Sequence, residues 1–253
     1  MISLEKFNLI CWIWIGIGII TFPILLKVKQ PYGRHTGNNW GPMINNKLGW
    51  FIMELPALLF FLFFVRFTSN WFNFMLVIAV SLWSMHYIHR AIIFPFLLKT
   101  KGKKMPVVIV LSAIFFNTVN GFINGYWLAY FAPEDKIDFS TDLRLVIGAV
   151  IFVIGFIINQ NHDQVLINLR KGKTTGYQIP YGGLFRFVSC PNFLGEIIIW
   201  TGFFVVTLSL PALAFLIWTM VNLLPRALDH HKWYKSEFAD YPAKRKAIFP
   251  FLL

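Results

Sequence analysis

Charged residues are scarce in this chain. Of its 253 residues, 13% are charged and 57% are hydrophobic, whereas soluble domains carry about 25% charged and about 45–50% apolar residues. This composition excludes an ordinary water-soluble globular protein. Seven membrane spans of about 20 residues would use roughly 140 residues, which is close to the whole apolar content.

Cysteine is nearly absent too, and so are the signatures of a soluble nucleotide-binding domain. Cys11 lies in the first apolar run and Cys190 in a basic loop, so we expect no disulfide. No small-residue cleavage site follows the first apolar run, and we expect a retained helix. No G-x-G-x-x-G follows a strand, and no stretch is long enough for a separate soluble domain. Any cofactor must therefore be bound by loops and helix ends of the membrane domain.

The apolar runs predict an all-α integral membrane protein with seven transmembrane helices. The expected spans are residues 7–26, 48–67, 71–90, 106–131, 141–158, 194–210 and 211–224. The last two runs are short and adjoin at Ser209-Leu210-Pro211. They form either a tight helical hairpin or a re-entrant pair.

The distribution of basic residues predicts the orientation. Of the 23 lysines and arginines, 19 fall in the first, third and fifth loops and the C-terminal tail. The positive-inside rule places these segments in the cytosol, with the N-terminus outside and the C-terminus cytosolic. The net charge of +12 thus reflects topology, with the lipid bilayer as the expected partner. We expect neither nucleic acid nor an obligate protein partner.

Glu54 is the only carboxylate well inside a predicted span. An ionised carboxylate at that depth costs about 2.5–3.5 kcal/mol on insertion scales, and such residues mark functional interiors. We expect a neutral acid that can donate a hydrogen bond. The alternative is a structural partner for a neighbouring polar group.

The fourth predicted span carries a polar stripe. Asn117, Asn120 and Asn124 recur at intervals of three and four residues, with glycines beside the last two. This spacing places them on one face toward the interior of the bundle. The stripe is either helix-packing contact or the wall of a cavity.

The third span ends in a motif with two histidines and a tyrosine. His86 and His89 are three residues apart, but no third ligand has metal-site spacing, so we predict no metal site. On this motif alone, Tyr87 is typical of the aromatic belt at a membrane interface.

A long polar stretch runs from Asn159 to Glu196. Ordered loops of such length are usually functional. Its arginine, lysine, amide and tyrosine side chains are suited to a large anionic cofactor. Residue types alone, however, favour a solvated basic cytosolic face.

Several short motifs together resemble one known family. They are Pro31-Tyr32-Gly33-Arg34-His35-Thr36, Glu54-Leu55-Pro56, His86-Tyr87-Ile88-His89-Arg90, residues 176–185, Asn192-Phe193-Leu194-Gly195-Glu196 and Asp240-Tyr241-Pro242. Nearly end to end, the chain resembles the steroid 5α-reductase family. The C-terminal half is also similar to membrane enoyl reductases and isoprenylcysteine-type methyltransferases, and the N-terminal motifs narrow the resemblance to the steroid branch.

The resemblance implies NADPH-dependent reduction of the C4–C5 double bond in a 3-oxo-Δ4 steroid. It implies a single seven-helix domain, with a steroid-site half over residues 1–133 and an NADPH-binding half over residues 134–253. Glu54 and Tyr87 would hydrogen-bond the 3-keto oxygen as catalytic residues. The host membrane would be the endoplasmic reticulum in a eukaryote or the cytoplasmic membrane in a bacterium.

The resemblance also assigns the binding residues by position. NADPH would be bound by Arg90, Lys103, Asn159, Asp163, Arg170, Tyr177, Asn192, Glu196, Arg226, His230, Tyr234 and Arg245. The steroid would contact Trp50, Met53, Phe116 and Trp200. Met53 departs from the family, which usually has glutamine there.

Three other functions remain open from the sequence. One is a related membrane reductase that acts on another enone or an enoyl lipid. A second is a membrane methyltransferase that uses S-adenosylmethionine, as the segment from Pro191 to Glu196 would allow. A third is a seven-helix receptor or transporter, although the polar residues gather in the cytosolic half instead of lining a path through the bundle.

Overall fold

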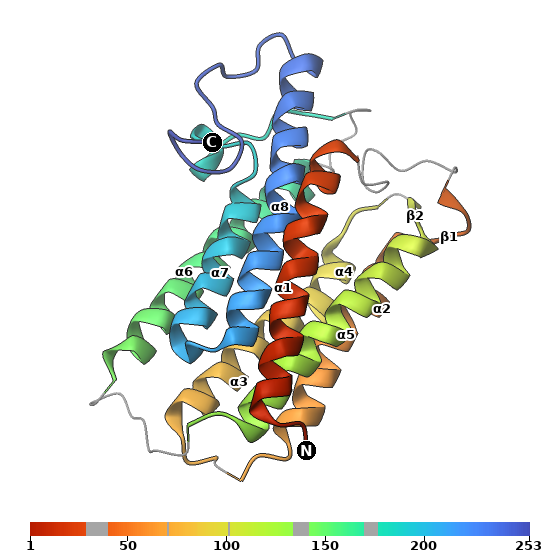
Figure 1. Cartoon of the computed structure of the whole chain (residues 1–253). Coiled ribbons are helices and arrows are strands. Elements are labelled where there is room, and N and C mark those ends of the chain that lie inside the picture. Colours follow the sequence, from red (N-terminus) through yellow and green to blue (C-terminus); the bar gives the residue numbers. More distant parts are fainter. Residues whose placement is uncertain (29–39, 70, 101, 134–141, 170–176) are drawn as a thin grey trace.

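The computed structural model is a bundle of long helices that run alongside one another (Figure 1). It describes residues 1–28, 40–69, 71–100, 102–133, 142–169 and 177–253. The long helices are α1 (Leu4–Lys27), α2 (Asn46–Val65), α3 (Phe74–Tyr87), α5 (Val107–Tyr130), α6 (Leu143–Leu169), α7 (Pro191–Thr207) and α8 (Leu210–Glu237). The short elements are η3 (Ile88–Ile93), α4 (Phe94–Leu97), η4 (Gly183–Arg186), β1 (Met43–Asn45) and β2 (Lys104–Pro106).

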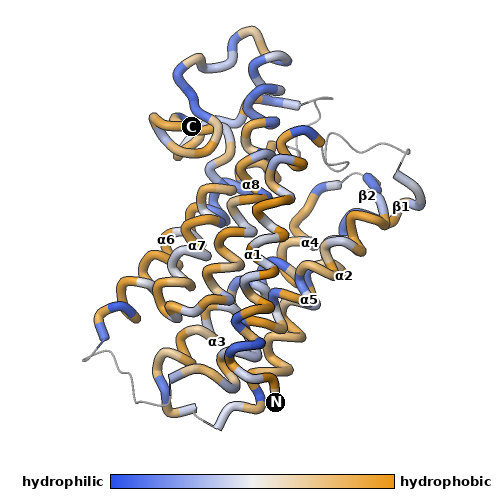
Figure 2. Tube along the Cα trace, in the orientation of Figure 1, coloured by the Kyte–Doolittle hydropathy of each residue, from blue (hydrophilic) through white to orange (hydrophobic). Residues whose placement is uncertain are grey.

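Among the described residues, six helical segments are long and apolar enough to cross a membrane. They are α1, α2, the continuous run Phe74–Leu97, α5, α6 and α8. Their outer faces expose large apolar side chains, for example Ile20 at 69% and Phe115 at 63%, as expected for contact with lipid rather than water. Hydrophilic residues concentrate toward the bundle ends (Figure 2). The chain is mostly helical, and its six apolar helical segments support the prediction of a multi-pass membrane protein.

The sixth predicted span, residues 194–210, is not established in the same way. α7 has 17 residues, fewer than the about 20 that a bilayer requires. It forms an antiparallel hairpin with α8 through Leu208 and Ser209 (Figure 1). Leu208 adopts the left-handed conformation, with φ of 43°, and the Ser209 hydroxyl caps α8 by accepting from Ala212 N at 3.3 Å.

Three helical segments extend beyond the predicted spans, the first being the run from Phe74, which ends at Leu97 instead of near Arg90. α6 continues to Leu169 instead of ending near 158, and α8 continues to Glu237 instead of ending near 224. Hydropathy detects only the part of a helix that is apolar on all sides. The extensions are polar on one face and keep buried residues such as Ile167 and Tyr234 on the other. They carry side chains of the candidate site beyond the apolar layer.

Close approach of paired helices fixes the register of the bundle. A Cβ on Gly195 would lie 2.5 Å from Asn159 N, so only glycine allows α7 to approach α6 here. A Cβ on Gly125 would likewise lie 2.6 Å from Phe61 O and would separate α5 from α2. The glycines of the predicted polar stripe therefore serve helix packing.

The helix that begins at Phe74 changes its winding before Pro95. Residues Ile88–Ile93 form a π-helical turn, in which Phe94 N donates to His89 O. Proline lacks an N–H and its ring clashes with the carbonyl four residues earlier, and a wider turn accommodates this disruption. Such turns recur at functional sites, and this one carries Arg90.

The described part of the chain also contains a small sheet that the sequence did not predict. β1 and β2 pair antiparallel, with Ile44 opposite Met105. The pair ties the start of α2 to the start of α5. Near the other end of the sequence, Val188 forms a parallel bridge with Lys246, which anchors the C-terminal segment.

Candidate active site

Arg90 lies at the centre of a buried polar network between α2, η3 and α6. Its Nε lies 3.8 Å from Glu54 Oε1, and its Nη1 lies 3.5 Å from Asp163 Oδ2. The guanidinium stacks over the Trp50 ring at 4.7 Å and over the Phe94 ring at 4.8 Å. The wide π-helical turn thus directs one cation between two carboxylates and two aromatic faces.

Glu54 is held by a side chain from α5. Asn117 Nδ2 donates to Glu54 Oε2 at 3.2 Å and to Met53 O at 2.5 Å. Asn117 is 5% exposed, so this amide is fixed by packing as well as by hydrogen bonds. Oε2 is therefore the accepting oxygen, and Oε1 is the oxygen turned toward Arg90.

Tyr87 is brought to the level of Glu54 by a contact one turn away. Trp83 Nε1 donates to Ala57 O at 3.2 Å, which joins α3 to α2. Tyr87 follows Trp83 by four residues and Glu54 precedes Ala57 by three, and the two helices are antiparallel (Figure 1). Both residues therefore lie one turn from this bond in the same direction.

Glu196 accepts hydrogen bonds from two other helices and from its own. Asn159 Nδ2 of α6 donates to Oε2 at 3.0 Å, and Trp200 Nε1 of α7 donates to Oε1 at 3.2 Å. His86 Nε2 of α3 lies 3.3 Å from Oε1. The close packing at Gly195, the preceding residue, allows Asn159 to reach this carboxylate.

Asn192 connects Asp163 to Asn159, which in turn hydrogen-bonds Glu196. Its Nδ2 donates to Asp163 Oδ1 at 2.9 Å, while its backbone oxygen accepts from Asn159 Nδ2 at 3.0 Å. The network therefore runs without a break from Asn117 through Arg90 to Glu196. It joins the predicted steroid half to the predicted NADPH half.

By itself, this network is unfavourable for folding, because its charged groups lose water on burial. Arg90 pairs with Glu54 and Asp163, and His86 pairs with Glu196. The side-chain exposure of Glu54, Asp163 and Glu196 is 14%, 10% and 15%. Buried ion pairs seldom repay their desolvation, and ionisable residues at membrane depth are typically functional. The arrangement is suited to hydrogen-bonding a polar group that enters an otherwise apolar interior.

A second group of predicted residues lies in an aromatic layer outside the core network. Lys103 Nζ lies 5.5 Å from the Tyr177 ring centre, and Tyr177 packs on Trp233 at 5.1 Å. Tyr234 stacks on Tyr241 at 5.3 Å. Cationic and aromatic side chains of this kind suit the phosphates and the base of a nucleotide.

Arg245 is buried within this layer and is engaged by protein groups. Its Nη1 donates to Pro180 O at 3.3 Å, and its guanidinium lies 4.9 Å from the Tyr241 ring and 5.5 Å from the Tyr181 ring. Burial raises the pKa of the Tyr241 phenol, which keeps it a neutral partner. Arg245 thus joins the C-terminal segment to the loop at Pro180.

Three more predicted cofactor residues belong neither to the buried network nor to the aromatic layer as described above. His230 packs on Phe193 at 5.7 Å, next to Asn192. Arg226 is half-buried one turn earlier on α8. Arg170 lies outside the described residues.

The predicted steroid contacts fall into three places. Trp50 covers Arg90, and Trp200 lies in the aromatic core, 5.9 Å from Tyr87 and 4.3 Å from Phe215 between ring centres. Phe116 joins that core through Phe215 at 6.0 Å. The side chain of Met53 instead packs toward Met105 and Val110, apart from the carboxyl of Glu54.

Two residues of the network carried no site assignment in the sequence. His86 belongs to one of the family motifs, but the sequence predicts neither a metal site nor a binding role for it. Its Nδ1 is buried without a hydrogen-bond partner in the described part of the chain. Its partner Glu196 lies 110 positions later in the sequence, so residue spacing could not predict that the two side chains meet. Asn117 belongs to the polar stripe. Its spacing from Asn120 and Asn124 predicted that it faces the bundle interior, but not that it contacts Glu54.

Comparison with known proteins gives a consistent result. A sequence family described as 3-oxo-5-alpha-steroid 4-dehydrogenase matches residues 103–253. The chain is 39% identical over 236 residues to steroid 5-alpha-reductase DET2 of Arabidopsis thaliana, covering 90% of each chain. It is 34% identical over 258 residues to 3-oxo-5-alpha-steroid 4-dehydrogenase 1 of Bos taurus, covering 98% of each chain. The resemblance seen in the motifs is confirmed: the chain belongs to the 3-oxo-5-alpha-steroid 4-dehydrogenase family.

Proposed function

We propose that this protein reduces the C4–C5 double bond of a 3-oxo-Δ4 steroid to the 5α-reduced 3-oxo product, with NADPH as the reductant. The observation that carries this proposal is the Glu54 carboxyl, which Asn117 fixes through Oε2 at the level of Tyr87 on the adjacent helix. The family membership supports the same reaction.

The role of Glu54 and Tyr87 follows from the chemistry of an enone. Its β-carbon accepts a hydride readily only when the charge that develops on the carbonyl oxygen is stabilised. Two fixed donors in a water-poor site act as an oxyanion hole for that charge. Because the Asn117 amide already donates to Oε2, a protonated Glu54 would donate to the keto oxygen from Oε1.

The remaining network is suited to one end of the cofactor. NADPH, when bound, supplies the hydride. Asn159, Asp163, Asn192 and Glu196 offer amide donors and carboxylate acceptors at the inner end of the cytosolic half. A second group offers cations for the phosphates of a dinucleotide and aromatic rings for its base. It consists of Lys103, Tyr177, Arg226, His230, Tyr234 and Arg245. Arg90 lies between the two groups, and Arg170, also proposed for NADPH, lies outside the described residues.

The orphaned Nδ1 of His86 supports a polar ligand in this region. A buried nitrogen without a partner costs free energy that a ligand group can recover. An apolar bundle also suits a steroid, which partitions into lipid before it binds.

The direct test is purified protein with NADPH and either progesterone or testosterone. We expect loss of NADPH absorbance and a product two mass units heavier with 5α stereochemistry. A 5β product, or no turnover with either steroid while an enoyl lipid is reduced, would contradict the proposal. Thermal stabilisation by S-adenosylmethionine but not by NADPH would favour the methyltransferase alternative instead.

A further inference from the structure

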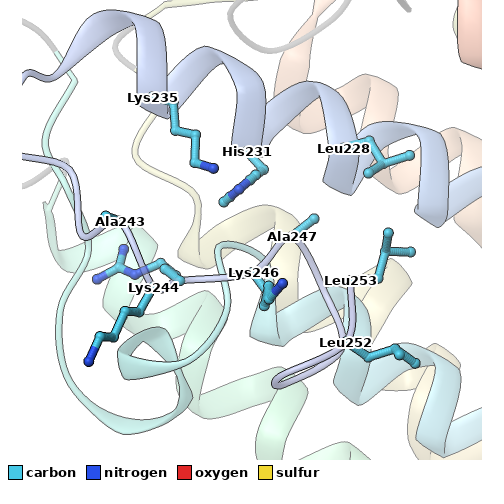
Figure 3. A pocket seen from close by; sticks show the side chains of 10 residues that line it. Leu228, His231, Lys235, Ala243, Lys244, Lys246, Ala247, Leu252 and Leu253 are labelled. Atoms are coloured by element: carbon cyan, nitrogen blue, oxygen red, sulfur yellow. The ribbon is translucent and has the colours of Figure 1, made fainter.

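A pocket of about 450 Å³ lies between the last turns of α8 and the C-terminal segment (Figure 3). Five basic residues line it: His231, Lys235, Lys244, Arg245 and Lys246. No acidic side chain is among the described residues that line it. Figure 3 shows Lys235 beside His231 on the helix, opposite Lys246 on the C-terminal segment.

The walls of this pocket are held in place by the protein itself. Lys246 N donates to Phe187 O at 2.8 Å, and Ser189 N donates to Lys246 O at 2.8 Å. The Ser189 hydroxyl lies 2.6 Å from both His231 Nδ1 and the Tyr241 hydroxyl. These bonds hold the Lys246 backbone and the His231 ring, so the two facing walls of the pocket are in place before an anion binds.

The rim of the pocket is apolar and exposed. Phe251 and Leu252 are 82% and 79% exposed, and the Phe251 ring packs on Phe187 at 5.6 Å. Leu252, Leu253 and Leu228 also line the pocket on the side away from the lysines. A water-facing protein surface rarely presents such side chains together, whereas a membrane interface favours them beside basic groups.

We infer that this pocket binds the headgroup of an anionic phospholipid. The lipid phosphate would accept hydrogen bonds from Lys235 and Lys246, and its acyl chains would lie along Leu252 and Leu253. The cationic wall selects against zwitterionic lipid, and the apolar rim selects against a soluble anion. The pocket lies outside the buried polar network, and among its lining residues Arg245 alone is proposed for the cofactor. The guanidinium of Arg245 is engaged by Pro180 O and the Tyr241 ring. The lipid contacts of Lys235 and Lys246 therefore go beyond the proposed reaction.

The test is lipid binding by the full-length protein in detergent. Native mass spectrometry and the unfolding temperature would be compared with phosphatidylglycerol, phosphatidylcholine and inorganic phosphate. We expect retained phosphatidylglycerol adducts and thermal stabilisation by that lipid only. Equal binding of phosphatidylcholine, or equal stabilisation by phosphate alone, would overturn the inference.

The lysines provide matched variants. K235Q/K246Q should weaken phosphatidylglycerol binding about thirtyfold, since each lysine near a membrane surface is worth about 1 kcal/mol. K27Q/K232Q removes the same charge from exposed positions outside the pocket and should change binding little. Equal loss in both double variants would show diffuse attraction and overturn the site.

Two further measurements keep the test decisive. K235Q alone alters an exposed side chain on α8 and should keep the fold while weakening binding about fivefold. The Kd for NADPH should stay unchanged in K235Q and in K235Q/K246Q. A weakened NADPH affinity with unchanged lipid binding would assign the pocket to the cofactor and refute the inference.

Discussion

At the scale of single residues, the site depends on how one carboxyl is held. Glu54 would be an unfavourable residue in an apolar helix without the groups around it. Asn117 and Arg90 approach its two oxygens from different helices. The identity of Glu54 was predictable because it is an isolated carboxylate in an apolar run, but its partners come from elements that only the fold brings together.

Removal of either proposed donor to the keto oxygen should abolish most turnover. We expect Glu54→Gln and Tyr87→Phe each to lower kcat by about 10²–10³, the usual cost of one oxyanion-hole donor. The Kd for NADPH should not change, because neither residue is assigned to the cofactor. Steady-state kinetics and cofactor titration check this, and near-normal kcat in both variants would remove these residues from the mechanism.

Asn117 should matter for geometry rather than for stability alone. Asn117→Ala leaves the Glu54 carboxyl free to rotate, and a misplacement of about 1 Å can cost about 100-fold in rate. We expect kcat to fall strongly with little change in the steroid KM. Asn124→Ala is the matched control, because Asn124 Nδ2 donates to the backbone oxygen of Asn120 in its own helix and not to Glu54.

The pair separates a positioning role from a packing role. Both asparagines are buried on the same face of α5, at 5% and 2% exposure. Asn124→Ala should lower the unfolding temperature and leave kcat near normal. If both variants lose kcat in proportion to their loss of stability, Asn117 has no positioning role.

At the scale of elements, the sequence predicted the helices better than their ends or their pairing. α1, α2 and α5 begin and end within a few residues of the apolar runs. The extensions of α6 and α8 were not predicted, because amphipathic turns are not uniformly apolar. The small sheet was also missed, because strands of three residues carry no periodicity and β2 lies far along the chain from β1.

The contact between α6 and α7 should tolerate no side chain at Gly195. Gly195→Ala places a Cβ 2.5 Å from Asn159 N, and overpacking of this kind typically costs about 1–3 kcal/mol. We expect a lower unfolding temperature and weaker NADPH binding, because the bond from Asn159 to Glu196 would be disturbed. Gly16→Ala, where nothing lies within 4 Å of an added Cβ, is the control and should leave both unchanged.

At the scale of the whole molecule, the two ends of the bundle differ in chemistry. The N-terminus lies at one end and the C-terminal segment at the other (Figure 1). The positive-inside rule predicts that the C-terminal end is cytosolic. The residues assigned to the cofactor then face the compartment that supplies it, and the steroid reaches the apolar interior from the bilayer.

Labelling of single cysteines would test this orientation. Phe72→Cys lies in the connection between α2 and α3, where Phe72 is 84% exposed, and the two native cysteines are buried. A membrane-impermeant maleimide should label it from the outside only, and should label Lys232→Cys from the cytosolic side only. The reverse pattern would invert the topology.

The central claim is that the buried network holds the polar end of an enone while the nicotinamide faces the ring-junction carbon. The most direct measurement uses NADPH deuterated at the transferred position, with the product examined by nuclear magnetic resonance. The account predicts deuterium at C5 on the α face of the steroid product, with this product formed about 10²–10³ times more slowly when Glu54 is replaced by glutamine. Product without deuterium at C5 would contradict it.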